Sequence, residues 1–298
     1  GSEIQGQSRR PDSQTNEYST MSLAKIAKGI KAGTVAAWGP GRKLDLVGFD
    51  ACLMSNTAVF NAMKDLAHFQ LASEENEPAH GWDYTGLNPG VTGAGSTTEQ
   101  YCTSMIDRYM STGSANSAAP LTLACVDLAK FKDFELEFDK LAYGLRLAAQ
   151  IPNAAILSEW SNARSDTHDW KGVWTVAVMI SLKTCRTHLA TRLDASDQSC
   201  ALRVQIRSLV GATLTAFDNM VVHYGSEHDY FTGVSIYFPT LSDYMIVPSG
   251  YEASFGNVDG FLTYVGATVW FWDYFYLMPT WWYTLESFYM MRWPHPGG

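Results

Sequence analysis

A cysteine and a group of acidic residues occupy two turns of the predicted fold. Cys52 follows the short apolar segment 44–49 and precedes a predicted helix, and Asp50 lies two residues before it. Glu74 and Glu77 follow the next apolar segment along the chain. Because the ends of neighbouring strands in an α/β sheet meet at one edge, where ligands bind, we expect the thiol and these carboxylates to converge there.

These residue types indicate a nucleophile beside a pocket for a cation. A thiol at the N-terminus of a helix lies in a field that lowers its pKa and favours the reactive thiolate. Neighbouring carboxylates oppose that ionisation, so they make more sense as the partners of a positively charged group. The pattern therefore predicts a substrate that carries an Arg or Lys side chain.

Composition narrows the function classes further. The 298 residues include 21 Lys and Arg against 30 Asp and Glu, a net charge of −9 that argues against nucleic-acid binding. Five cysteines without a C-x-x-C pair argue against a zinc knuckle or a thioredoxin-type site. The sequence has no P-loop and no G-x-S-x-G motif, which argues against a nucleotide-binding protein and a serine hydrolase.

The apolar pattern predicts an α/β fold around the two turns. Segment 44–49 has the mostly apolar character of a strand buried on both faces of a parallel sheet. We expect Gly33 to end the first helix and Ser55 to be the N-cap of the helix that follows Cys52. The predicted helices cover about 21–32, 56–67, 97–111, 131–149 and 201–224, and the predicted strands 44–49, 68–75, 121–128 and 233–239.

The segments LDLVGFDACLM and LASEENEPAHGWDY resemble the clostripain family of cysteine peptidases. The resemblance continues through TLACVDLAKF and GVSIYFP and covers roughly residues 17–275. It implies a caspase-like α/β fold, with a mostly parallel sheet and helices on both faces. It also implies a cysteine endopeptidase that cleaves after Arg or Lys. We therefore expect a peptidase domain at 1–275 and a separate aromatic tail at 276–298.

The resemblance also implies roles for the residues of the two turns. Cys52 matches the nucleophile, and Asp50 matches the aspartate that lines the specificity pocket. The segment after the second strand matches a loop beside that pocket, where Glu74 and Glu77 are the candidates for contacting a basic side chain, with Asp83 behind them. The alternative for these glutamates is a structural role, as helix caps or as ligands of a structural cation.

The family's general base is a histidine in a His-Gly motif that precedes the nucleophile, and these 298 residues contain no such motif before Cys52. We therefore expect a chain that is N-terminally truncated, or a heavy chain whose partner light chain carries the histidine. His80 is the local candidate for a substitute base. His223 and His228 flank Glu227, and their spacing favours a solvated polar turn over a metal site.

Two other interpretations remain open: a non-catalytic caspase-like module for binding or scaffolding, and an enzyme that uses the acidic residues with a metal ion. The peptidase interpretation needs no cofactor for its chemistry and leaves room for a bound Ca²⁺ ion. The expected partners are protein or peptide substrates with Arg or Lys, and no nucleic acid. No membrane span is expected, because no apolar run reaches about 18 residues. The family resemblance implies a secreted or cell-envelope protein, although residues 1–20 do not have the pattern of a signal peptide.

Overall fold

The computed structural model describes most of the chain and divides it into two compact units. The first unit comprises Gly1–Ala129 and Met220–Ser235, and the second comprises Lys130–Asn219 and Ile236–Gly298. The described residues are 23–78, 80–88, 93, 95–113, 120–150, 154–167, 179–181, 201–238 and 277–292.

A four-stranded sheet in the order β1-β2-β3-β5 forms the centre of the first unit. Its elements are α1 (Leu23–Trp38), β1 (Leu44–Phe49), α2 (Thr57–Met63), β2 (Ala67–Ala72), η1 (Tyr84–Leu87), α4 (Thr98–Gly113), β3 (Thr122–Asp127) and β5 (Val221–Ser226). Strands β1 and β2 are parallel, with Phe49 opposite Ala72, so both chains leave the sheet at the same edge. The predicted α/β class is confirmed, and β1, β2 and β3 lie where strands were predicted.

The direction of the other strands differs from the prediction of a mostly parallel sheet. Strand β3 pairs antiparallel with β2 and with β5, so only one of the three pairs in this sheet is parallel. Strand β3 has the apolar run of a strand buried on both faces, and its first five residues are buried. An apolar run of this kind indicates that both faces of the sheet are covered at this strand, but it does not indicate whether the neighbouring strand is parallel or antiparallel.

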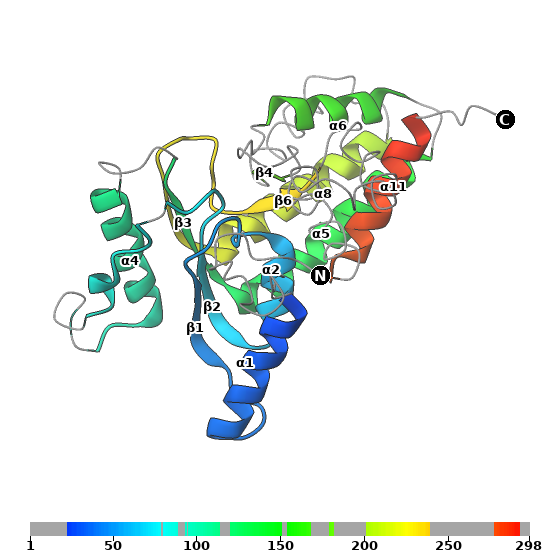
Figure 1. Ribbon diagram of the computed structural model, residues 1–298. Helices are drawn as coiled ribbons and strands as arrows, with labels where there is room; N and C mark the ends of the chain where they lie inside the picture. The colour runs from blue at the N-terminus through cyan, green and yellow to red at the C-terminus, as the bar shows by residue number, and fades with distance from the viewer. Residues whose placement is uncertain are drawn as a thin grey trace, which may run out of the picture. The chain divides into compact units, whose positions relative to one another are not determined.

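Helices cover both faces of this sheet. Figure 1 shows α4 on one side and α1 and α2 on the other. Helix α4 buries a stripe at helical spacing, Cys102, Met105, Ile106 and Tyr109, against apolar side chains of the strands. The buried members of this cluster from outside α4 are Leu71, Trp82, Leu121, Leu123 and Cys125.

Helix α1 is longer than predicted. Gly33 does not end it, because a glycine inside a helix costs only about 1 kcal/mol and leaves the hydrogen-bond ladder intact. The helix ends at Trp38, and the next residue, Gly39, has a φ of +83° and donates its N–H to the Val35 carbonyl at 2.9 Å. This left-handed glycine is the usual way to close a helix.

The segment predicted as one helix over 201–224 contains two elements. Helix α8 covers Ala201–Met220, and the chain then continues directly into β5, which pairs with β3. Val221, Val222 and Tyr224 are β-branched or aromatic residues that suit a strand. Their apolar character extends the helical pattern without a break, so periodicity alone misses the boundary.

The second unit contains most of α5 (Leu128–Ala149), together with α6 (Ala154–Asp166), β4 (Met179–Ser181), α8 and α11 (Pro279–Arg292). Strand β4 pairs with β6 (Ser235–Tyr237) in a two-stranded sheet. Trp160 packs against Phe288 with ring centroids 4.3 Å apart, and Trp281 packs against Phe138 at 5.1 Å. The aromatic segment near the C-terminus therefore contributes to the core of this unit. None of the helices in the described ranges is long and apolar enough to cross a lipid bilayer.

Candidate active site

Cys52 lies in a turn between β1 and α2 that the neighbouring strand holds in place. The Leu53 N–H donates to the Glu75 carbonyl at 3.1 Å, and the Ser55 N–H donates to the Ser73 carbonyl at 2.8 Å. These bonds form because β1 and β2 are parallel and end together. The turn with the cysteine and the turn with the acidic residues are therefore joined by their backbones.

The residue after the cysteine has an unusual backbone conformation. Leu53 has a φ of +62°, in the left-handed region that non-glycine residues rarely adopt, and its side chain is buried. Asn56 supports this conformation by donating from Nδ2 to the Leu53 carbonyl at 2.7 Å, while its Oδ1 caps α2. The predicted cap, Ser55, instead donates its hydroxyl to the Gly233 carbonyl at 2.5 Å. The side chains around the cysteine thus fix a strained turn, as is common at functional sites.

The thiol of Cys52 is partly exposed and contacts the main chain of Glu77. Its Sγ accepts the Glu77 N–H at 3.2 Å and lies 3.9 Å from the Glu77 carbonyl. Burial raises the pKa of this thiol, and the negative charges of Glu77 and Glu75 raise it further, while the N–H of Glu77 acts in the opposite direction. At neutral pH the free protein therefore holds Cys52 as a thiol, which requires a base before it can act as a nucleophile.

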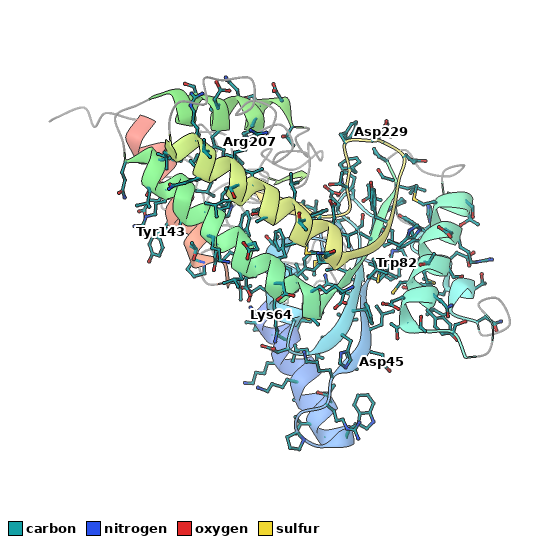
Figure 2. All side chains as sticks on the ribbon, turned by 180° about the vertical axis from the view of Figure 1, so that it is seen from behind. Asp45, Lys64, Trp82, Tyr143, Arg207 and Asp229 are labelled. Carbon is teal, nitrogen blue, oxygen red and sulfur yellow. The ribbon has the colours of Figure 1, made fainter. Side chains whose placement is uncertain are left out.

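Two aromatic residues hold the carboxyl of Glu77. The indole Nε1–H of Trp82 donates to Oε1 at 2.8 Å, and the Tyr109 hydroxyl donates to Oε2 at 2.5 Å. Burial raises the pKa of Glu77 to about 7 in spite of these bonds, and burial also raises the pKa of Glu75 to about 7. Trp82 lies between the sheet and α4, as Figure 2 shows, where its ring contacts the backbone of Gly48 in β1.

Asp50 faces the loop that follows Glu77. Its Oδ2 accepts the Trp82 N–H at 3.3 Å and the Tyr84 hydroxyl at 2.8 Å. Gly81 has a φ of +66°, and a Cβ placed on it would lie 2.8 Å from the same Oδ2 but 3.5 Å from Oδ1. The loop therefore approaches Asp50 closely, and it encloses Oδ2 more tightly than Oδ1.

The other predicted acidic residues contact protein groups. Glu74 is 1% exposed, and its Oε2 accepts the backbone N–H groups of Thr232 at 3.1 Å and Gly233 at 2.7 Å. Asp83 forms an ion pair with Arg108 at 2.8 Å. These contacts favour structural roles for both residues. Glu77 and Glu75 are the carboxylates whose charge acts on Cys52, and Asp50 lies two residues before the cysteine in the same turn.

Sequence reasoning did not identify the aromatic residues that bind the carboxyls at this site. Trp82 and Tyr84 lie in the GWDY segment, where they can be suspected only from their position in the loop that follows Glu77. Tyr109 belongs to the buried stripe of α4, and its hydroxyl reaches Glu77 only because α4 packs on this face of the sheet. No spacing rule connects a residue in α4 with a loop 32 positions earlier.

His80, His223 and His228 contact groups other than Cys52. Nδ1 of His80 contacts the carbonyl of Gly81 at 2.7 Å, and within the described residues the hydrogen bonds of Cys52 are those to Glu77. His223 lies in β5 and pairs with Asp107 at 2.9 Å, so it is not part of a turn. His228 stacks on Tyr230. Among the residues described above, no group of three His, Cys, Asp or Glu side chains could hold a metal ion.

Comparisons with known proteins connect this geometry to one family. The profile of the clostripain family, Peptidase_C11, matches residues 13–264. A cysteine protease from B. fragilis has a similar fold, with a TM-score of 0.53 at 16% identity, and the match covers 86% of this chain and 98% of that one. A clostripain from Bacteroides thetaiotaomicron, solved with the peptide inhibitor BTN-VLTK-AOMK, gives a TM-score of 0.50 at 18% identity and covers 86% and 97%.

A further structure is that of a secreted C11 cysteine protease from Bacteroides thetaiotaomicron, with a TM-score of 0.47 at 18% identity over 74% of this chain and 55% of that one. A comparison with curated proteins found no match. The profile covers most of the chain, including both turns of the site. The chain therefore belongs to the clostripain family of cysteine peptidases.

Proposed function

We propose that this chain is the part of a cysteine endopeptidase that carries the nucleophile and the pocket for a basic side chain. The observation that carries this proposal is the position of Cys52. Its thiol is partly exposed in a braced turn, with the Glu77 N–H on its sulfur and the Asp50 and Glu77 carboxyls on the adjoining segments. A thiol so placed suits attack on a peptide that anchors a cationic side chain beside it.

In the proposed reaction, the Cys52 sulfur attacks the scissile carbonyl carbon after a base removes the thiol proton. The tetrahedral intermediate collapses when the C–N bond breaks and the amine leaves with a proton from the same acid–base group. Water then attacks the thioester, which releases the carboxylic acid and restores the thiol. No cofactor takes part in these steps, and a structural Ca²⁺ ion remains a prediction.

Asp50 is the proposed charge partner of an Arg or Lys side chain before the scissile bond. A cation that enters a partly desolvated pocket requires a carboxylate there, because an uncompensated charge is costly. Glu77 adds a second carboxyl near the pocket, although two aromatic groups already bind it. We do not assign Glu74 a contact with substrate, since its carboxylate binds backbone amides in the interior.

The acid–base group is expected to come from a histidine outside these 298 residues, such as one on a light chain. General-base assistance is worth roughly 100- to 10,000-fold in rate. We therefore expect negligible hydrolysis of an Arg-amide substrate by these residues alone. Rapid turnover by the purified chain would contradict this expectation and direct attention to His80. Secretion of the protein likewise remains a prediction.

Covalent labelling tests the proposal without requiring a complete catalytic group. Peptidyl chloromethyl ketones with Arg, Lys or norleucine at the last position are incubated with the chain at an alkaline pH, where part of the Cys52 thiol ionises without a catalytic base, and the adducts are located by mass spectrometry. The Cys52 sulfur attacks the methylene carbon, chloride leaves with the bonding electrons, and the thiol proton passes to the buffer. We expect the Arg and Lys probes to label Cys52, while Cys102 and Cys125 stay unlabelled because they are buried.

Two variants complete this experiment. Cys52→Ala should abolish labelling, and Asp50→Asn should lower the labelling rate of the basic probes about 100-fold, with a much smaller effect on the norleucine probe. Equal losses for all three probes would mean that Asp50 only braces the turn. Labelling of Cys102 in place of Cys52, or no labelling of Cys52 by any probe, would overturn the proposal and favour a non-catalytic module.

A further inference from the structure

The carboxylate of Asp50 presents its two oxygens differently. Oδ2 accepts two hydrogen bonds, from the Trp82 N–H and the Tyr84 hydroxyl, and the backbone of Gly81 lies against it. A carboxylate oxygen has about two lone pairs, so Oδ2 has no further capacity for a donor while Tyr84 stays in place. Oδ1 lies farther from the position that a Cβ on Gly81 would take, and among the described residues it accepts no hydrogen bond, so it is the oxygen that remains for a ligand.

This asymmetry distinguishes the two basic side chains. A guanidinium binds a carboxylate best as a fork, with two parallel N–H groups on the two oxygens. A Lys ammonium is a compact charge that donates to single acceptors in several directions. Oδ1 of Asp50 offers one such acceptor, and the Tyr84 oxygen offers another, because a hydroxyl that donates to Asp50 can still accept.

We propose that Tyr84 is a specificity-determining residue that makes this pocket favour Lys over Arg. The inference rests on the proposed function, since it takes Asp50 as the partner of the substrate's cation. The hydroxyl of Tyr84 donates to Oδ2 of Asp50, which a fork-shaped guanidinium would need as its second acceptor. The oxygen of the same hydroxyl can accept a hydrogen bond from a Lys ammonium that also binds Oδ1 of Asp50. Tyr84 is 55% exposed, so loss of its hydroxyl leaves the core of the first unit unchanged.

The test is a competition between the Lys and Arg chloromethyl ketones, mixed in equal amounts, for Cys52. The ratio of the two adducts, measured by mass spectrometry, reports the preference independently of how fast the thiol reacts. We expect the wild-type chain to carry more Lys adduct. Tyr84→Phe frees one lone pair of Oδ2 for a second guanidinium N–H, so the Lys-to-Arg ratio should fall roughly tenfold, the value of one hydrogen bond to a charged group.

Tyr143→Phe is the matched control, because it removes the hydroxyl of a tyrosine in α5 that is as exposed as Tyr84, and it leaves Asp50 with its partners. We expect this variant to keep the wild-type ratio. A wild-type preference for Arg, a ratio unchanged by Tyr84→Phe, or an equal change in both variants would overturn the inference. If neither basic probe labels the wild-type chain faster than the norleucine probe, the proposed function fails as well, which separates the two failures.

Discussion

At the scale of single residues, the carboxyls of Glu75 and Glu77 should make stability depend on pH. Burial raises the pKa of each from the ordinary value of 4.5 to about 7 in the folded protein. Between these values the folded chain binds more protons than the unfolded chain, so the free energy of unfolding falls as pH rises. The slope is about 1.4 kcal/mol per pH unit for each proton, and it levels off above the folded pKa.

The measurement is urea unfolding at several pH values within that window. The double variant with Glu75→Gln and Glu77→Gln has no groups to titrate at these positions, so its stability should depend less on pH than that of the wild type. Glutamine keeps an oxygen acceptor for the Asn76 N–H and for Trp82. Parallel pH profiles for the two proteins would show that these carboxyls ionise normally.

The sequence predicts the positions of these residues better than their partners. Cys52 and Asp50 could be placed at the sheet edge because a buried strand must end before them. The bonds of Glu77 to Trp82 and Tyr109, and the bond of Asp50 to Tyr84, depend on a helix and a loop whose approach no local pattern specifies. For the same reason, the sequence could not separate Glu74 from Glu77 by role.

At the scale of elements, Glu74 in the segment after β2 and Ser55 in the turn of Cys52 both bind the segment between β5 and β6, and we call the bonds of Glu74 a clamp. Glu74→Ala removes the acceptor of the Thr232 and Gly233 N–H groups in the interior. We expect the free energy of unfolding to fall by about 3 kcal/mol. Glu74→Gln keeps an oxygen acceptor and should recover part of this loss.

Glu99 provides the control for this prediction, because it is an exposed glutamate in the first turn of α4. Glu99→Ala should change the free energy of unfolding by less than about 0.5 kcal/mol. The measurement is chemical denaturation followed by circular dichroism. Equal stability of the Glu74→Ala and Glu99→Ala variants would contradict a clamping role for Glu74.

Local signals predict elements well where an element begins or ends with a distinctive residue. Strand β1 matches its predicted bounds because charged and glycine-rich segments flank it, and α4 differs by one or two residues. The junction of α8 and β5 at Met220 has no such residue, so the strand was absorbed into the helix. Strand direction depends on contacts across the sheet, which explains why β3 was not expected to be antiparallel.

At the scale of the whole molecule, the aromatic segment near the C-terminus should stabilise the second unit. Trp281 in α11 is 3% exposed and packs against Phe138, Trp160 and Phe238. Trp281→Ala should lower the free energy of unfolding by about 3–5 kcal/mol, the usual loss for a large buried aromatic side chain. Urea unfolding followed by near-ultraviolet circular dichroism measures this change.

Tyr283 lies in the same helix and is 42% exposed, which makes Tyr283→Ala a matched control. It should cost less than about 1 kcal/mol, since it loses mainly the contact with the Arg146 guanidinium. If both variants were equally stable, α11 would not be part of the core. The sequence predicted an aromatic tail at 276–298 and could not identify its partners, because they come from α5, α6 and the segment after β6.

The bonds of Glu74 also mean that the turn of Cys52 gains its last supports late in biosynthesis. Glu74 and Ser55 bind Gly233 or its neighbours, which leave the ribosome long after the turn itself. Nascent chains fold from the N-terminus as they emerge, so the thiol of Cys52 is present well before the supports from this later segment. A copy that stops before this point keeps the local bonds of the turn but lacks the contacts of Ser55 and Glu74 with Gly233. If the chain is the peptidase proposed above, such a copy holds its thiol in a turn that is less firmly fixed than in the finished protein.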